Sequence, residues 1–119
     1  MLKQFNLTGK EFKEEEWRWT YKLKIIFNEK QINEATITDH YQKKHSDVVT
    51  NELILEILAE KLNNKWIDPL SESYLWERDI FHFETSYRNQ SYRLIFWFKK
   101  DTSDHLWIRN CYPIKSSSE

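Results

Sequence analysis

Two histidines and two lysines crowd into the short stretch from Thr36 to His45. Imidazole titrates near neutral pH, so His40 is a candidate general acid or base. Lys43, Lys44 and His45 form a cationic cluster that could hold a phosphate backbone or stabilise a pentacovalent phosphate. The alternative interpretation is structural, namely a half-buried histidine beside a set of solvated charges.

A second set of candidates lies near the C-terminal end, where arginines alternate with aromatic residues. A guanidinium can hold a phosphate through two hydrogen bonds, and an aromatic ring can stack on an unpaired base. The same residues also fit ordinary cross-strand packing, with Trp97 and Trp107 in the core. The set comprises Arg88, Arg93, Arg109, Tyr87, Tyr92, Trp97, Trp107 and Tyr112.

Residue counts exclude several kinds of site. Gly9 is the only glycine, whereas the phosphate-binding loops of nucleotide enzymes need several. Cys111 is the only cysteine, so neither an intrachain disulfide nor a cysteine-rich zinc site can form. His40 and His45 are too far apart in sequence to share one helical face neatly. We therefore expect no metal and no cofactor, and a buried, unreactive thiol at Cys111.

The composition indicates one folded domain, because 119 residues suffice for a single core. The N-terminus lacks the apolar core of a secretory signal, and no apolar run could span a membrane. We expect a cytoplasmic protein with no membrane partner. The net charge is −1, but residues 46–84 carry nine acidic and three basic side chains. This uneven spread could give a basic face and an acidic helical face; the alternative is that the acidic residues simply solvate the outer side of the helix.

Alternation of apolar and polar residues from Trp17 to Phe27 predicts a long strand with an apolar face and a basic face. Three further strands are predicted at Tyr74 to Glu84, Tyr92 to Phe98 and His105 to Ile114. The first two of these would be joined by a hairpin turn at Arg88-Asn89-Gln90.

Two helical segments are predicted between the first strand and the other three. Thr50 is a suitable N-cap for a helix that runs to about Asn63, with apolar residues at helical spacing. Asp39 can cap a shorter helix that ends at His45.

We therefore predict an α+β fold with a single four-stranded, mainly antiparallel sheet. Its order would be strand, helix, helix and three strands, with the helices packed on one face. Residues 1–15 are expected to form a flexible N-terminal arm, residues 16–115 a single α+β domain, and residues 116–119 a disordered tail.

The order of these elements resembles a known family when three motifs are considered together. They are Ile37-Thr38-Asp39-His40 after the first strand, Tyr92-Arg93-Leu94-Ile95-Phe96, and Ile108-Arg109-Asn110-Cys111-Tyr112. The pattern resembles the RelE-like branch of the small bacterial ribonuclease toxins, a group that includes barnase-like and colicin-type ribonucleases. The likeness covers roughly residues 17–114 in topology.

The resemblance implies metal-independent cleavage of RNA by transesterification. In that scheme His40 would be the base or acid, Arg93 and Arg109 would stabilise the phosphorane, and Tyr112 or His105 would assist. Lys43, Lys44, His45 and Arg88 are the candidate RNA-binding residues. We expect His40 and Arg93 to converge across a shared concavity.

The leading hypothesis is thus a small toxin-type endoribonuclease whose partners are RNA and an antitoxin or other protein. The competing hypothesis is a non-catalytic binding protein, such as a phage-encoded inhibitor, an immunity protein or a regulatory partner. It would act through an acidic or aromatic surface. Nucleic-acid binding without cleavage is a third reading.

Overall fold

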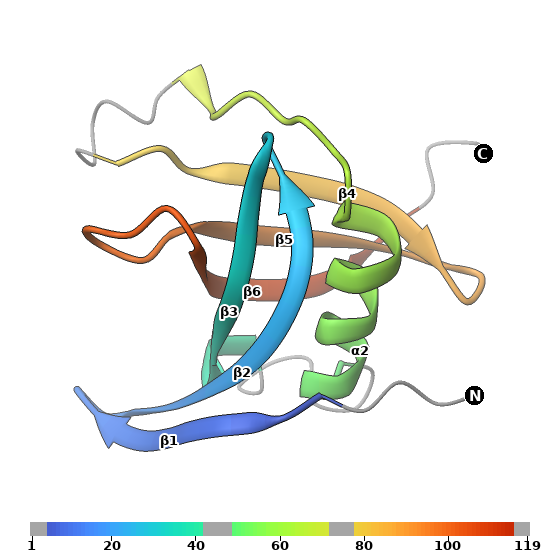
Figure 1. The fold of residues 1–119 in the computed structure, drawn as a ribbon. Coiled ribbons are helices and arrows are strands. Elements are labelled where there is room, and N and C mark those ends of the chain that lie inside the picture. The colour runs from blue at the N-terminus through green and yellow to red at the C-terminus, as the bar shows by residue number, and fades with distance from the viewer. Residues whose placement is uncertain (1–4, 42–48, 72–77, 116–119) are drawn as a thin grey trace.

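Six strands form one mixed sheet in the computed structural model, which describes residues 5–41, 49–71 and 78–115 (Figure 1). The spatial order is β1-β2-β3-β6-β5-β4, and every neighbouring pair is antiparallel except β3 and β6, which run parallel. The strands are β1 (Leu7–Lys13), β2 (Glu16–Phe27), β3 (Lys30–Thr38), β4 (Phe81–Tyr87), β5 (Gln90–Phe98) and β6 (His105–Ile114).

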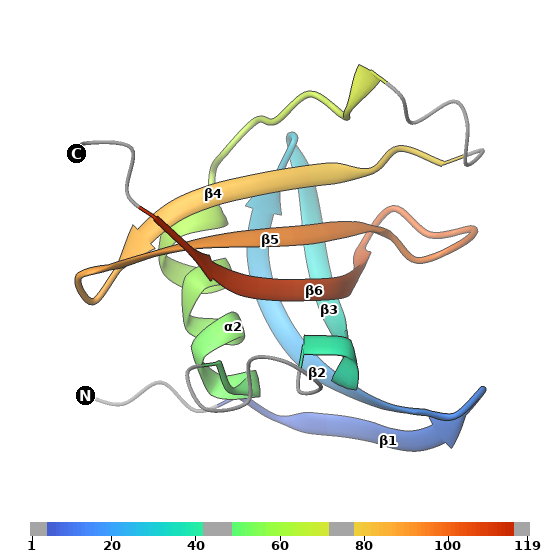
Figure 2. The same cartoon turned by 180° about the vertical axis from the view of Figure 1, so that it is seen from behind.

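The sheet is strongly twisted, so β2 and β3 run across the direction of β4, β5 and β6 (Figure 1). The helix α2 (Asn51–Ile57) packs on one side of the sheet, and in the reverse view it lies behind β4, β5 and β6 (Figure 2). The β1–β2 turn and the β5–β6 connection project on the side away from α2 (Figure 1). The two sides of the sheet therefore have different environments.

Three two-residue turns set the register of the hairpins. The residues Asn28-Glu29 join β2 to β3 and Arg88-Asn89 join β4 to β5, and all four have positive φ between 51° and 66°. Such left-handed pairs match the twist of the flanking strands, and asparagine tolerates them well. Glu14 and Glu15 do the same between β1 and β2, with φ of 55° and 62°.

The helical region begins at the predicted cap. Thr50 has an extended backbone and its Oγ1 accepts a hydrogen bond from the Leu53 N–H at 3.1 Å. The helix α2 continues directly into a π-helical turn, η2 (Leu58–Leu62). The side chains that both segments bury against the sheet are Ile54, Leu55, Ile57, Leu58 and Leu62.

The centre of the core is a cluster of three phenylalanines from three strands. Phe27 lies edge-on to Phe81 and Phe96, with ring centroids 5.1 and 5.4 Å away. All three side chains are almost completely buried. Burying a side chain of this size contributes about 1.5–3 kcal/mol, so this contact between β2, β4 and β5 is a main source of stability.

The predicted α+β fold with a four-stranded sheet is wrong, because the described residues form mostly strands with one short helix, and the sheet is a mixed one of six strands with a parallel pair at its centre. The prediction lacked β1, which falls in the expected arm, and it included no strand at the position of β3. The edge strand β1 is mostly exposed, so it carries no apolar alternation. In β3 the buried Thr36 and Thr38 break the apolar pattern.

The expectation of several helices on one face is also wrong, since one short helix with its π-helical turn packs there. After β3 the described part of the shorter predicted helix is a single 3-10 turn, η1 (Asp39–Tyr41). The rest of that helix, residues 74–77 of a predicted strand and the tail at 116–119 lie outside the described residues. The predicted strands at Trp17 to Phe27 and His105 to Ile114 are confirmed as β2 and β6.

A first prediction concerns Cys111, which is completely buried on the helix side of β6. Burial raises the pKa of its thiol to about 12, so almost no thiolate exists at pH 8. We expect native protein to react with a chromogenic disulfide reagent at least 100-fold more slowly than protein in denaturant. Equal rates would show that this side of β6 opens readily.

Candidate nucleic-acid interface

The sheet face opposite α2 carries a groove of about 1080 Å³. Because successive side chains of a strand point to opposite faces, Ile37 and Ile108 enter the core while Thr36 and Trp107 face this groove. Residues of the β1–β2 turn and of the β5–β6 connection line part of the groove, and Figure 1 shows where these two loops lie. Its lining residues are Glu11, Lys13, Glu14, Glu16, Arg18, Thr20, Thr36, Arg78, Ile80, Trp97, Lys99, Lys100, Trp107 and Arg109.

Two tryptophans in the groove are each covered by an arginine. The guanidinium carbon of Arg18 lies 5.1 Å from the Trp107 ring centroid, and that of Arg78 lies 4.8 Å from Trp97. Trp97 and Trp107 are half-buried, so the expectation that they belong to the core is wrong. Their position provides flat aromatic and guanidinium surfaces against which a planar ligand can stack.

Glu16 holds two of the arginines in place. One carboxylate oxygen accepts from Arg18 Nε at 2.9 Å, and the other accepts from the Arg109 guanidinium at 3.1 Å. Arg18 also reaches Glu14 at 3.4 Å. Because the Glu16 side chain is only 14% exposed, these interactions are poorly screened by water and fix the arginine positions.

Four more cations make the groove basic. Lys13, Arg78, Lys99 and Lys100 line it and have no ion pair with any residue in the described ranges. In total the lining contains six basic and three acidic side chains. The groove therefore attracts anionic ligands although the whole chain has a net charge of −1.

One wall of the groove contains a chain of polar side chains. Thr20 Oγ1 lies 2.7 Å from Thr36 Oγ1, which lies 2.7 Å from His105 Nε2. On the other side of the imidazole, Nδ1 is 3.6 Å from a Glu34 carboxylate oxygen. Burial lowers the pKa of His105, and Lys99 lowers it further, whereas Glu34 and Asp104 act in the opposite direction. The imidazole is therefore neutral at pH 7.

Two of the predicted catalytic residues are in direct contact. Arg93 on β5 and Tyr112 on β6 are brought together, since the guanidinium donates to the Tyr112 hydroxyl at 3.0 Å. Arg93 also forms an ion pair with Glu84 of β4. Arg109 lies instead in the groove, bound to Glu16. His40 is in η1, half-buried and next to the end of β3.

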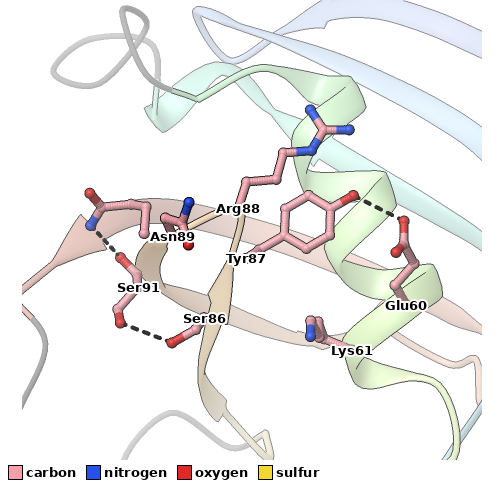
Figure 3. Close-up of a pocket in the computed structure, with 8 residues that line it drawn as sticks. Glu60, Lys61, Ser86, Tyr87, Arg88, Asn89 and Ser91 are labelled. Carbon is pink, nitrogen blue, oxygen red and sulfur yellow. Dashed lines mark hydrogen bonds between the residues drawn. The ribbon is translucent and has the colours of Figure 1, made fainter. Parts of the chain in front are cut away.

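The predicted RNA-binding residues are not in the groove as far as the structure describes them. Lys43, Lys44 and His45 lie outside the described residues. Arg88 lies in the β4–β5 turn, beside a second pocket of about 610 Å³ (Figure 3). There its guanidinium pairs with Glu56 at 3.0 Å, which neutralises its charge.

That second pocket is organised by Tyr87 and two carboxylates of the helical region. The Tyr87 hydroxyl lies 3.0 Å from Glu56 and 2.9 Å from Glu60, and the ring points toward the helix (Figure 3). Carboxylates in this position repel phosphate. The pocket thus suits a structural contact between β4 and the helix better than it suits RNA.

Sequence reasoning missed most of the groove. The alternation in β2 did place Arg18 and Thr20 on the face opposite the core, but it did not indicate which residues their side chains contact. Arg78 lies just before β4, within the strand predicted at Tyr74 to Glu84, and sequence reasoning gave it no role. The pairing of Thr36 with His105 depends on the parallel contact of β3 and β6, which no local pattern predicts.

Comparison with protein-family models, with curated proteins and with solved structures finds no match to this chain. In the described part of the chain, no helix has the length and apolar character needed to cross a bilayer. Among the same residues, no three His, Cys, Asp or Glu side chains gather closely enough to hold a metal ion.

A second prediction follows from the Tyr87 contact. Desolvation and the hydrogen bonds to Glu60 and Glu56 raise the pKa of Tyr87 from 10.0 to about 12. Stability that depends on the protonated phenol is therefore present below pH 10 and lost as the pH rises through 12. We expect Tyr87→Phe to lower the free energy of unfolding by about 1–3 kcal/mol at pH 7.

Urea unfolding of both proteins at several pH values tests this. The difference between wild type and Tyr87→Phe should shrink between pH 10 and pH 12. Ser86→Ala, which removes an exposed hydroxyl contact on the same pocket, should change stability by less than about 0.5 kcal/mol. A difference that stays constant up to pH 12 would rule out the assigned role of the phenol proton.

Proposed function

We propose that the groove binds single-stranded nucleic acid, with RNA as the expected ligand. The observation that carries this proposal is the pair of arginine-covered tryptophans, Trp97 and Trp107, surrounded by cations. Stacking surfaces hold unpaired bases, and the cations neutralise the phosphates between them. The bases of a duplex are already stacked on one another, so they could not stack on the tryptophans.

The dimensions of the groove agree with a ligand larger than one small molecule. The groove is lined from β1, β2, β3, β5 and β6, so a strand could run across several elements. The Arg18–Glu16–Arg109 set supplies guanidinium groups in a fixed arrangement for phosphate oxygens.

We further propose cleavage of that RNA by metal-independent transesterification, the activity of a small toxin-type endoribonuclease. Arg109 in the groove and the Arg93–Tyr112 pair on the neighbouring strands are the supporting features. A guanidinium stabilises the phosphorane charge, and a phenol held by an arginine can donate a proton. His40 remains the proposed base or acid.

A second candidate function is protein binding through an aromatic surface on the β1–β2 hairpin. Phe12 and Trp17 are 59% and 39% exposed, and their rings meet edge-on at 5.3 Å. Trp17 stacks in turn on Trp19 at 6.5 Å. Exposed aromatic clusters are common at protein interfaces, so an antitoxin or another protein partner could bind here.

A third prediction tests the groove. Arg78→Ala should weaken binding of a fluorescent single-stranded RNA about threefold or more, measured by anisotropy at low salt. It should also reduce the slope of log affinity against log salt by about 0.7, because one fewer phosphate is neutralised. Arg78 is exposed, so the fold should be unaffected.

Arg88→Ala is the matched control, since Arg88 is also an exposed arginine over an aromatic ring, 5.1 Å from Tyr87. It should leave RNA affinity unchanged. Equal losses in the two variants would point to non-specific charge attraction, and no RNA binding by wild type would refute the proposed function.

A fourth prediction tests cleavage separately from binding. Wild-type protein should cleave total RNA in the presence of a chelator. His40→Ala or Arg93→Ala should each reduce the rate about 100-fold, the usual scale for an acid/base or charge-stabilising group. If intact RNA is recovered from complexes with wild type, the endoribonuclease proposal fails while the binding proposal stands.

A further inference from the structure

The polar chain in the groove wall is held by strand register. Thr20 and Thr36 are directly paired residues of β2 and β3, while Glu34 and His105 are paired across β3 and β6. Both threonines line the groove, and His105 lies behind them with only 7% of its surface exposed. The two hydroxyls therefore join a buried imidazole to the ligand space.

The direction of each hydrogen bond in this series of polar side chains can be deduced. The Glu34 carboxylate faces Nδ1 of the neutral imidazole and favours the tautomer with its proton there. Nε2 then carries a lone pair and accepts the hydroxyl proton of Thr36 at 2.7 Å. A hydroxyl has only one proton, so Thr36 must accept from Thr20 at 2.7 Å.

The Thr20 hydroxyl has thus used its only proton within the protein. What it presents to the groove are oxygen lone pairs, so it can accept a hydrogen bond from a ligand but cannot donate one. Arg18, two residues earlier on the same strand face, and Trp107, paired with Thr36, also line the groove, with the Arg18 guanidinium over the Trp107 ring. A phosphate-binding group and a stacking surface therefore accompany a fixed acceptor in the same groove.

We propose that Thr20 Oγ1 accepts a hydrogen bond from a ribose 2′-hydroxyl, and that this contact makes the groove select RNA over DNA. The inference rests on the proposed function, because it assigns the sugar preference of the same groove. The 2′-hydroxyl is the group by which a protein distinguishes the two nucleic acids at one position, and DNA has no donor there. Thr36, His105 and Glu34 are positioning residues that orient the Thr20 hydroxyl.

The test compares three fluorescent single strands of one sequence, namely RNA, 2′-fluoro RNA and DNA. Fluorine keeps the ribose-like sugar shape but cannot donate a hydrogen bond. Affinities are measured by anisotropy on ice with a chelator, and strand length is checked on a gel afterwards. Wild type should bind RNA about tenfold more tightly than 2′-fluoro RNA, the scale of one well-formed hydrogen bond.

Thr20→Val should bind RNA and 2′-fluoro RNA equally, at the wild-type affinity for the fluorinated strand. Thr20→Ser restores the hydroxyl and should restore the tenfold ratio. Thr85→Val is the matched control, because Thr85 is a half-buried strand threonine of β4 that does not line the groove. It should keep the ratio. A general loss of packing would weaken both strands alike and leave the ratio unchanged.

The outcomes separate this inference from the proposed function. If wild type binds RNA and 2′-fluoro RNA equally, or if Thr20→Val keeps the preference, the 2′-hydroxyl contact is refuted and the groove remains a nucleic-acid site. If wild type binds none of the three strands, both the proposed function and this inference are overturned.

Discussion

The rest of the structure depends on the parallel pairing of β3 with β6. This contact joins two antiparallel three-stranded units, one from each end of the chain, into one sheet. It also places Thr36 beside Trp107 and Glu34 beside His105, residues about seventy positions apart in sequence. Parallel pairing needs a long connection, and the segment between Thr38 and Phe81, which contains α2, provides it. At this junction the core lies on one face of the sheet and the groove lies on the other.

Strand alternation then divides the chemistry between those faces. On β5 the buried Leu94 and Phe96 pack under the helix, while Arg93 and Trp97 point the other way. The helix side is closed by α2 and η2, whose buried apolar residues belong to the same core cluster as the three phenylalanines, so the opposite side is the one left available to a ligand. Arginines and tryptophans can remain there because each guanidinium is stacked or paired rather than buried alone.

Local sequence patterns were sufficient to predict the helix and strands that bury one face. The alternation from Trp17 to Phe27, the helical spacing after Thr50 and the strand from His105 could all be predicted from sequence, because burial of one face imposes a period on each of them. The edge strand β1 buries little, and β3 buries threonines whose hydroxyls are satisfied by other strands. Neither strand shows a regular alternation of apolar and polar residues, so the number of strands and the parallel pairing of β3 with β6 could not be predicted from local pattern.

The candidate site was less predictable than the fold because its residues come together only through long-range pairing. Arg109 was found from sequence as a cation beside aromatics, but its partner Glu16 lies 93 positions earlier. Glu16 is the first residue of the predicted domain, and sequence reasoning gave it no role. In the structure the Glu16 carboxylate neutralises part of the charge of Arg18 and Arg109 and fixes both side chains. Without it the two guanidinium groups would repel each other. An acidic residue thus helps to hold two cations close together in the basic groove.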